Sequence, residues 1–319
     1  DPAATCHTWL RILTENVGGN QDMVDFLQEW TGYLLLPDTS QQQFLVLTGR
    51  GGNGKSVYCA GVEAIVGKEN VSGMALEAFE DRFAKSLTLG KLVNISGDAP
   101  ELDALAEGVI KGFVSGNPMM FDRKNLPAIQ AKPTARLMIA CNQLPRVRDR
   151  TEGIWRRMLL SEWTHTILPQ NRVRGMDESD WWIKSGEVSG MFNWALDGLC
   201  RLRKQKGFST VSAMDVALGE HKLDCNPAQQ FLLEYLQPSE NSIRIGHVYQ
   251  MYCLWCRDRN ARALGQNRFS AEVKQYFPEM NRRKMYFGTT RQYCYGNLDY
   301  DPDAVSGEET AGAYPDSQF

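Results

Sequence analysis

The segment Gly49-Arg-Gly-Gly-Asn-Gly-Lys-Ser56 restricts the fold of this chain more than any other feature. It fits the pattern G-x-x-x-x-G-K-[S/T], whose glycines let the backbone curl so that successive N–H groups point at phosphate oxygens. The apolar run Phe44 to Thr48 precedes it, and a segment with helical apolar spacing begins at Val57. A strand, a glycine-rich loop and a helix in this order predict a phosphate-binding loop; a glycine-rich turn that fits by chance is the alternative.

This loop predicts contacts to both a nucleotide and a metal ion. The start of the following helix adds partial positive charge, Lys55 would reach the β- and γ-phosphates, and the Ser56 hydroxyl would hold Mg²⁺. We therefore expect ATP and Mg²⁺ as cofactors. The residues expected to contact the nucleotide are Gly49, Gly51, Gly52, Asn53, Gly54, Lys55, Ser56 and Val57.

Two further apolar runs indicate the kind of sheet to which the first belongs. Lys91 to Ser96 and Arg136 to Cys141 each begin about 45 residues after the previous run, with helical patterns between them. This alternation predicts a parallel α/β sheet, because parallel strands need helical crossovers.

Polar residues follow the second and third predicted strands. Asp98 is expected to be the carboxylate beside the metal, and Glu101 to polarise the attacking water. Asn142 is expected beside the γ-phosphate, where an amide can orient that water. Glu101 could instead be a solvated acid at a helix start, and Asn142 part of a turn. Which acid acts as the catalytic base stays open.

Arg156 and Arg157 are adjacent and precede an apolar run. Hydrolysis spreads negative charge over the γ-phosphoryl oxygens, and an arginine from a neighbouring subunit commonly stabilises that charge. We expect one of the two to have this role; a pair of solvated arginines is the alternative.

Charge is unevenly distributed along the chain. The net charge is -3, from 35 Lys and Arg against 38 Asp and Glu. Six of the acids lie in residues 299–319, which contain no Lys or Arg, so residues 1–298 carry a net +3. Residues 243–298 hold ten basic and three acidic side chains. This excess predicts a basic module suited to nucleic acid, followed by an acidic tail.

The basic module predicts two helices, Gly246 to Arg259 and Arg268 to Tyr276, and then a hairpin within Lys284 to Tyr295. This order suggests a winged-helix domain, which binds DNA with its second helix and its wing; a winged helix that only docks protein is the alternative. Cys253 and Cys256 do not predict zinc, because no second C-x-x-C follows. The expected phosphate contacts are Arg268, Lys274, Arg283, Lys284 and Arg291.

Apolar spacing divides the chain into five expected parts. Helical patterns fill the first part, a long helix runs from Ser189 to about Lys206, and Phe208 to Asn226 reads as a linker or helical lid. The expected parts are residues 1–40, an N-terminal helical subdomain; 41–207, an ATPase core; 208–242, a linker or lid; 243–298, a winged helix; and 299–319, an acidic tail.

Several of these segments, in the same order, resemble superfamily-3 helicases, in the phage and plasmid primase-helicase branch that is related to the poxvirus helicase-primase. The resemblance covers roughly residues 5–298. The matching segments are Leu27 to Tyr33, Gly49 to Ser56, Asn94 to Glu101, Ser115 to Lys124, Pro133 to Pro145, Gly153 to Leu159 and Trp194 to Leu199.

The resemblance implies an AAA+-like ATPase that assembles as a ring, usually a hexamer, and moves along single-stranded DNA. A lone subunit offers Arg156 and Arg157 no obvious route to its own loop, so catalysis between subunits would require a closed head-to-tail ring. Arg123, Lys124 and Lys132 would line the pore, where cations follow a phosphate backbone without recognising bases. An exposed hairpin tip is the alternative for Arg123 and Lys124.

We therefore expect an ATP-dependent replicative DNA helicase, the helicase part of a phage or plasmid primase-helicase, in the cytoplasm of a bacterium or of a virus-infected host. Expected partners are single-stranded and forked DNA, further copies of the chain, and a primase or polymerase. No apolar run is long enough for a membrane span. The alternatives are an ATPase that loads helicases or packages DNA without unwinding it, and a non-enzymatic origin-binding module.

Overall fold

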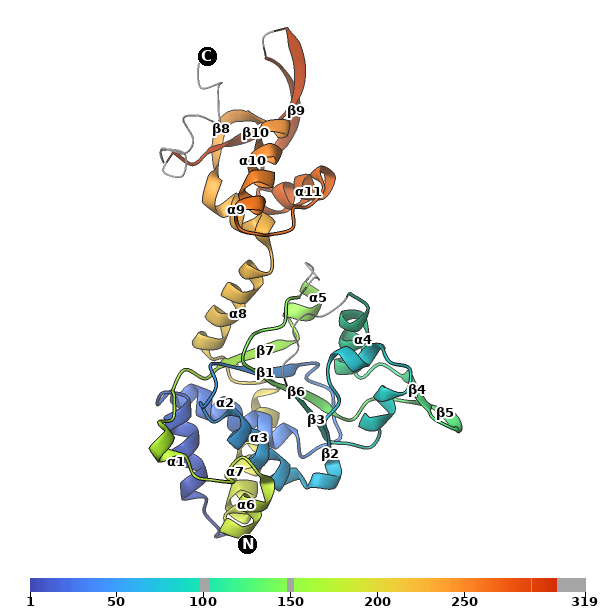
Figure 1. Cartoon of the computed structure of the whole chain (residues 1–319), viewed down its shortest axis with the longest axis vertical. Coiled ribbons are helices and arrows are strands. Elements are labelled where there is room, and N and C mark those ends of the chain that lie inside the picture. Colours follow the sequence, from blue (N-terminus) through green and yellow to red (C-terminus); the bar gives the residue numbers. More distant parts are fainter. Residues whose placement is uncertain (98–103, 148–151, 288, 303–319) are drawn as a thin grey trace. The chain divides into compact units, whose positions relative to one another are not determined.

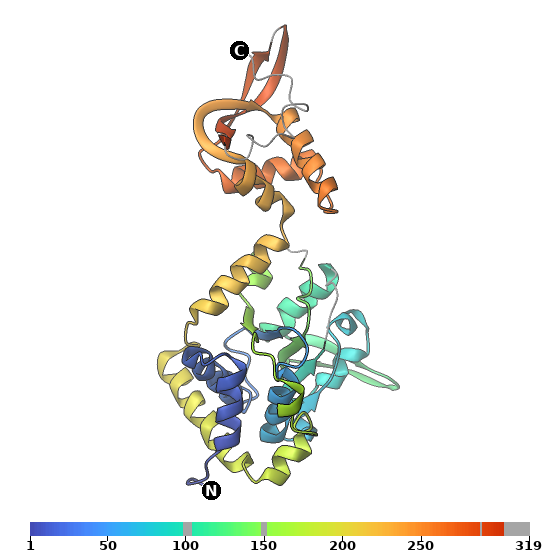
Figure 2. The same cartoon turned by 60° about the vertical axis from the view of Figure 1, so that its left-hand side comes forward.

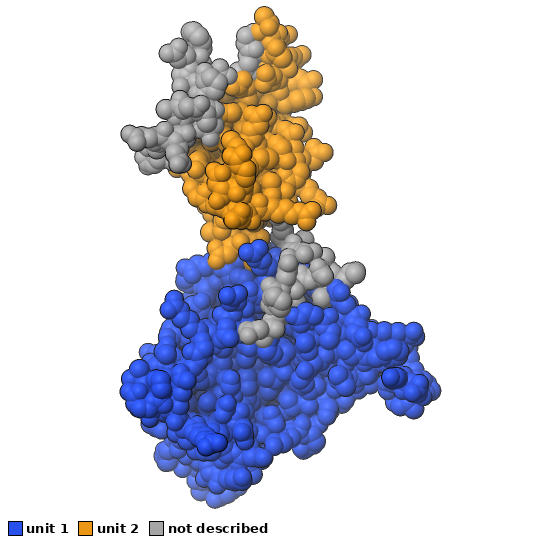
Figure 3. Space-filling model, viewed as in Figure 1, with its two compact units in different colours: residues 1–221 blue, residues 222–319 orange. Residues whose placement is uncertain are grey.

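The computed structural model describes residues 1–97, 104–147, 152–287 and 289–302. The chain divides into two compact units, Asp1–His221 and Lys222–Phe319, which are coloured separately in Figure 3. Helix α8 (Ser212–Asp224) contains the boundary. The predicted Asp98 and Glu101 lie outside the described residues.

The first unit is built on a five-stranded sheet of order β2-β3-β6-β1-β7, in which each neighbouring pair is parallel. The predicted parallel α/β sheet is confirmed, and its three predicted strands are neighbours. All five residues of β1 are buried, as an interior parallel strand requires. The strands are β1 (Phe44–Thr48), β2 (Val71–Ser72), β3 (Val93–Ser96), β6 (Arg136–Cys141) and β7 (Met158–Glu162).

One face of this sheet is covered by helices that share its hydrophobic core. Alternate residues of β1, Leu45 and Leu47, enter that core together with Met138 of β6. Figures 1 and 2 show the helices gathered on one side of the sheet. They are α1 (His7–Asn16), α2 (Gln21–Tyr33), α3 (Lys55–Val66), α6 (Ser179–Ser185) and α7 (Val188–Gln205).

Helices α2 and α7 approach each other closely because glycines face both sides of the contact. A Cβ at Gly32 would lie 2.3 Å from the carbonyl oxygen of Ala195, and one at Gly198 would lie 2.3 Å from that of Gln28. The Gln28 side chain also donates to the carbonyl of Trp194 at 2.8 Å. Because α1 and α2 belong to the same core as α3, residues 1–40 fold as part of the first unit.

The remaining elements of this unit connect the strands and helices named above along the chain. Strands β4 and β5 pair antiparallel as a hairpin, with Asn125 at φ +60° in its turn. Figure 1 shows this hairpin projecting from the unit. These elements are η1 (Lys68–Asn70), η2 (Glu77–Glu80), η3 (Ala84–Thr88), α4 (Ala104–Val114), β4 (Met119–Arg123), β5 (Leu126–Ala131), α5 (Glu152–Trp155) and η4 (Pro169–Asn171).

The second unit combines the helices α9, α10 and α11 with an antiparallel sheet of order β8-β10-β9. Its core is aromatic: the rings of Tyr252 and Phe269 stack at 4.3 Å, and Phe231 contacts both. The elements are α9 (Pro227–Tyr235), β8 (Leu236–Arg244), α10 (Ile245–Asp258), α11 (Gln266–Tyr276), β9 (Asn281–Phe287) and β10 (Thr290–Tyr300).

Strand β8 differs from the expectation for this part of the chain. Residues 208–242 were expected to form a linker or lid, yet α9 and most of β8 fall within them and belong to the second unit. The sequence of β8 contains Pro238, Glu240 and Asn241 and lacks apolar alternation, so its strand conformation depends on pairing with β10. Among the described residues, no helix combines the length and apolarity needed to traverse a lipid bilayer.

Candidate functional site

The glycine-rich loop connects β1 to α3 at the carboxyl edge of the parallel sheet. Three of its glycines have positive φ angles: +147° at Gly49, +81° at Gly52 and +88° at Gly54. A Cβ at Gly49 would lie 2.2 Å from the carbonyl oxygen of Trp163, and one at Gly54 would lie 2.1 Å from Nδ2 of Asn16. At these positions both the backbone conformation and the surroundings exclude a larger residue.

Lys55 is the first residue of α3, and its side chain is buried. Its Nζ donates to the carbonyl oxygen of Gly49 at 2.6 Å, to Oδ1 of Asn53 at 3.0 Å and to Oδ1 of Asn142 at 3.4 Å. Asn142 follows β6, the neighbour of β1. The ends of two adjacent parallel strands therefore bring Lys55 and Asn142 together.

Asn53 fixes the loop from its other side. Its Nδ2 donates to the carbonyl oxygen of Trp163 at 2.8 Å, while its Oδ1 accepts from Lys55. Trp163 follows β7, and its own N–H donates to the carbonyl of Thr48 at 2.7 Å. Asn53 thus joins the loop to the end of the strand on the opposite side of β1, so the loop is held between β6 and β7.

Two side chains beside the loop have no counterpart in the sequence pattern. Asn16, the last residue of α1, is 2% exposed, and its Nδ2 has no hydrogen-bond partner in the described structure. Arg172 lies next to the loop, with Nη2 2.4 Å from where a Cβ on Gly52 would be. The segment that carries Arg172 is held there because the N–H of Ile167 donates to the carbonyl of Gly52.

The described residues of the loop fit the phosphates of a nucleoside triphosphate. The loop offers a cradle that side chains would fill, a buried amide without a hydrogen-bond partner in the described structure at Asn16, and a lysine ammonium. The N–H groups at the start of α3 add partial positive charge. Ser56 is exposed in the first turn of α3, where its hydroxyl is accessible, and Val57 is half-buried against the core. Among the described residues, no cluster of three or more His, Cys, Asp or Glu offers a separate metal site.

Arg156 and Arg157 lie at the other edge of the sheet, where β7 begins. The Arg157 carbonyl accepts from the N–H of Phe44, the first residue of β1. A five-residue parallel strand spans about 17 Å, so that distance separates these arginines from the loop of their own chain.

The two arginines also have different surroundings. Arg157 is half-buried; its Nε and Nη2 donate to Oγ of Ser115 at 3.1 and 2.8 Å, and its Nη1 donates to the carbonyl of Gly153. Burial lowers the pKa of Arg157, with a further lowering from the charge of Arg156. Arg156 is exposed, and its side chain makes no hydrogen bond or ion pair with the residues that the structure describes.

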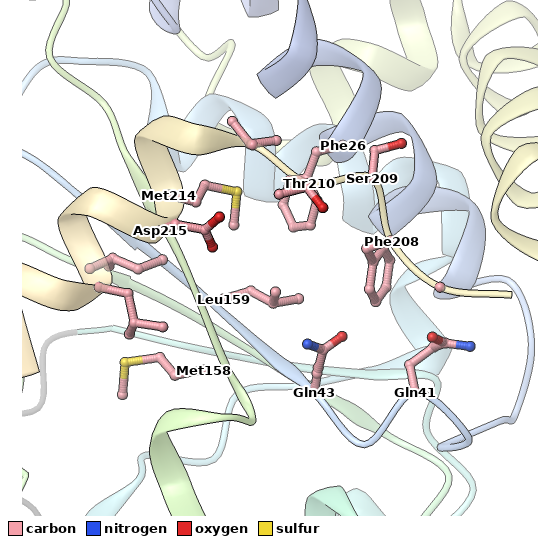
Figure 4. A pocket seen from close by; sticks show the side chains of 14 residues that line it. Phe26, Gln41, Gln43, Met158, Leu159, Phe208, Ser209, Thr210, Met214 and Asp215 are labelled. Atoms are coloured by element: carbon pink, nitrogen blue, oxygen red, sulfur yellow. The ribbon is translucent and has the colours of Figure 1, made fainter. Parts of the chain in front are cut away.

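A cavity of about 290 Å³ occupies this same amino edge, away from the loop. Figure 4 shows Met158 and Leu159 of β7 on one side of it, Phe26 and Phe208 on another, and Asp215 of α8 at its margin. The carboxyl edge of the sheet, and not this cavity, carries the residues predicted to bind phosphate.

The predicted pore cations lie on the β4–β5 hairpin. Arg123 is half-buried and its guanidinium donates twice to the carbonyl of Pro127, at 3.0 and 2.8 Å, which fixes the turn. Lys124 is exposed in the turn itself, and Lys132 is exposed directly after β5. The hairpin therefore displays Lys124 at its tip.

Some of the predicted DNA contacts of the second unit are exposed, and others are bonded to groups of the same unit. Arg268 is exposed in the first turn of α11, whereas Nζ of Lys274 donates to the carbonyls of Pro278 and Met280 at 2.7 and 2.8 Å. Arg283 bonds Oγ of Ser242 at 2.8 Å. Lys284 and Arg291 are exposed on the β9–β10 hairpin.

Comparison with known proteins finds distant relatives. Residues 47–157 match a family described as a family of unknown function, DUF5906. A protein of Acanthamoeba polyphaga mimivirus that is named as a helicase, L207/L206, is 22% identical over 259 residues, which cover 74% of this chain and 27% of that protein. The mitochondrial protein ymf21 of Marchantia polymorpha is 35% identical over 69 residues, covering 22% of this chain and 38% of that protein.

The fold as a whole is similar to solved structures. Two structures of the NrS-1 C-terminal region align with TM-scores of 0.58 and 0.55, at 10% and 9% identity. The alignments cover 93% and 90% of this chain and 76% and 74% of those chains. This chain spans only 27% and 38% of the length of the two curated relatives. The chain thus shares the NrS-1 C-terminal fold and is distantly related to a protein named as a helicase.

Proposed function

We propose that this chain is the motor part of an ATP-dependent DNA helicase of the superfamily-3 type, with an AAA+-like ATPase core. The observation that carries the proposal is the placement of Lys55 at the start of α3, bonded to the loop through Gly49 and Asn53 and to Asn142 at the end of β6. The distant relative that is named as a helicase supports the proposal that this site supplies energy for DNA unwinding.

In this proposal the loop residues hold the triphosphate and Lys55 compensates its charge. Ser56 and Asp98 would hold Mg²⁺, which neutralises charge on the phosphate oxygens when bound. Asn142 would orient the attacking water next to Lys55, with Glu101 as the candidate base. Asn16, whose buried Nδ2 has no partner in the described structure, is placed to donate to the nucleotide.

The site would be completed by a second copy of the chain. Arg156 is exposed at the edge of the sheet opposite to its own loop, so it can serve only the loop of a neighbour. Arg157 instead supports this position by bonding Ser115 and Gly153. A head-to-tail contact of this kind forms a ring when the rotation between subunits closes. We propose a ring of six subunits, as in the helicases that the sequence resembles.

DNA would contact both units. In the first unit, Lys124, Arg123 and Lys132 on the β4–β5 hairpin would line the pore and follow the phosphate backbone. In the second unit, the order α9, β8, α10, α11, β9, β10 with sheet order β8-β10-β9 supports a winged helix, with Arg268 as a phosphate contact. Forked DNA and a primase or polymerase would be the partners of the assembled ring.

A strand-displacement assay on a labelled forked duplex tests the proposal, run beside measurements of ATP hydrolysis by the same preparation. We expect ATP- and Mg²⁺-dependent unwinding that Lys55→Ala abolishes, because that substitution removes the cation at the triphosphate. Hydrolysis without unwinding by an assembled ring would instead indicate a loader or packaging motor. DNA binding with no hydrolysis in either protein would indicate an origin-binding module.

A further inference from the structure

One face of the β9–β10 hairpin alternates aromatic and basic side chains. In the register of this antiparallel pair Tyr293 is opposite Lys284, Tyr286 is opposite Arg291, and Tyr295 is opposite Arg282. Residues directly opposite each other share a face, and so do alternate residues along one strand. The face therefore consists of Arg282, Lys284, Tyr286, Arg291 and Tyr293, with Tyr295 at its base, and is called the hairpin face below.

The outer part of the hairpin face is open, although its base is covered. Tyr295 is buried, and its hydroxyl bonds Oγ of Ser270 on α11 at 2.7 Å. Further along the hairpin, Tyr293 is 50% exposed and Tyr286 is 71% exposed. Figures 1 and 2 show the hairpin extending beyond the helices of its own unit. Two tyrosine rings on paired strands are thus in contact with solvent.

Cations surround both rings. The Arg282 guanidinium lies 5.1 Å from the centre of the Tyr293 ring, the Lys284 ammonium lies 4.7 Å from it, and Arg291 lies 5.9 Å from the Tyr286 ring. Residues 281–298 contain no Asp or Glu. Within the described part of the chain none of these three cations forms an ion pair. The acid of these two strands, Asp299, lies at the far end of β10 and accepts from Nδ2 of Asn241. The outer part of the hairpin therefore concentrates positive charge without an acid beside it.

This combination of groups points to a polyanion with flat rings. Exposed cation–π contacts contribute only about 0.5–1 kcal/mol each, which leaves the rings available to other partners. Aromatic side chains within a basic surface are the usual platform for single strands, since bases stack on the rings while cations follow the phosphates. A duplex keeps the faces of its bases stacked inside and cannot use such rings.

We propose that the hairpin face is a binding site for single-stranded DNA, in which Tyr286 and Tyr293 stack with bases while Arg282, Lys284 and Arg291 bind phosphates. Tyr286 and Tyr293 are diagonal neighbours on adjacent strands, about 7–8 Å apart by general sheet geometry, so one strand of DNA can reach both. The site requires neither ATP nor the ring and is therefore independent of the proposed helicase activity.

Binding of a labelled oligothymidylate to the full chain, measured by fluorescence anisotropy without nucleotide, tests this site. Replacing Tyr286 and Tyr293 together by Ala should weaken binding by roughly 30-fold or more, because each stacked base contributes about 1–3 kcal/mol. The salt dependence should stay the same, because no cation is lost. Replacing Lys284 and Arg291 by Ala should instead flatten the slope of log K against log salt by about 1.4, from two phosphate contacts on a single strand.

Three controls make the result decisive. Tyr286→Phe with Tyr293→Phe should keep the affinity, because the rings remain, and Phe192→Ala, which removes an exposed ring from α7, should also keep it. Lys55→Ala should bind as the parent does, so failure of hydrolysis or unwinding leaves this result unaffected. Unchanged affinity in the Tyr286 and Tyr293 double Ala variant, an equal loss for duplex DNA, or tighter binding of oligouridylate than of oligothymidylate would overturn the proposal.

Discussion

Asn53 shows how a single side chain can determine the shape of the loop. It accepts from the Lys55 ammonium and donates to the carbonyl of Trp163, so it connects the helix that follows β1 with the end of β7. The same interaction positions Lys55, whose ammonium would otherwise have fewer oxygen partners. Asn53, at a variable position of the pattern, therefore holds the loop in its conformation.

Two glycines of the same loop allow a matched comparison of stability after substitution by Ala. Gly54→Ala should lower the free energy of unfolding by at least about 1–2 kcal/mol, because φ is +88° and the new Cβ would meet Asn16. Gly51→Ala should change it by less than about 0.5 kcal/mol, since the space around Gly51 is open. Urea unfolding of both variants measures the difference, and an equal loss in both would contradict the described loop.

The sequence pattern predicts the loop but not all of its surroundings. The glycines are predictable because the positive φ angles of the loop require them. Lys55 is predictable because a phosphate-binding loop needs a cation at the start of the following helix. Asn142 is predictable because adjacent parallel strands end at one edge, although its distance from Lys55 is not. Asn16 and Arg172 belong to no pattern, because α1 and the segment after β7 reach the loop only through the tertiary fold.

At the scale of elements, the contact between α2 and α7 depends on a buried carboxylate. Glu29 is 0% exposed; it accepts from Nε of Arg201 at 2.6 Å, from Gln205 at 2.9 Å, and from the N–H and hydroxyl of Ser209 at 2.7 Å each. These bonds and the close approach at Gly32 show that the segment Leu27 to Tyr33 packs against α7.

Glu29→Ala should therefore destabilise the first unit by about 2–4 kcal/mol, because it leaves Arg201 and three further donor groups of Gln205 and Ser209 without this acceptor. Arg201 is about one-third exposed and can recover some bonds to water, which places the loss below that of a fully buried pair. Glu15→Ala, which breaks an exposed pair with Arg11, should cost less than about 0.5 kcal/mol. Thermal unfolding compares the two, and similar shifts would contradict the assigned role of Glu29.

The β4–β5 hairpin allows a prediction about the pore. Replacing Arg123 and Lys124 together by Ala should weaken binding of single-stranded DNA and flatten its salt dependence, because fewer counterions are released. Replacing Arg203 and Lys204, an exposed adjacent pair at the end of α7, is the matched control and should change neither. An unchanged slope in the hairpin variant would move the DNA contact to another surface.

Elements could be predicted from the sequence where they are long or apolar. The runs beginning at Phe44, Lys91 and Arg136 form strands of one sheet. In β1 and β6 the apolar residues are continuous, as in a buried parallel strand, whereas β3 alternates apolar Val93 and Ile95 with buried Asn94 and Ser96. Strand β2 has only two residues, and β8 contains Pro238 and polar side chains, so neither has a local signal. Their conformations come from pairing with β3 and β10.

In the whole fold, the order of the strands places both arginines away from their own loop, and their side-chain contacts distinguish one from the other. The sequence shows Arg156 and Arg157 as equivalent neighbours, whereas the structure places both at the amino end of β7 and engages only Arg157 with Ser115 and Gly153 among the described residues. No sequence pattern contains that distinction, because it depends on the pairing of β7 with β1 and on contacts with α4 and α5. The exposed Arg156 is the arginine expected to reach a neighbour.

Mixing two inactive variants tests most directly whether a neighbour's Arg156 completes the site. Lys55→Ala and Arg156→Ala should each lack ATP hydrolysis alone, since every site in either homogeneous ring misses one essential cation. In an equal mixture of the two, roughly one quarter of head-to-tail interfaces combine an intact loop with an intact arginine, so hydrolysis should return to about that fraction of the parent rate. Full activity of Arg156→Ala alone, or no recovery on mixing subunits shown to exchange, would contradict the account.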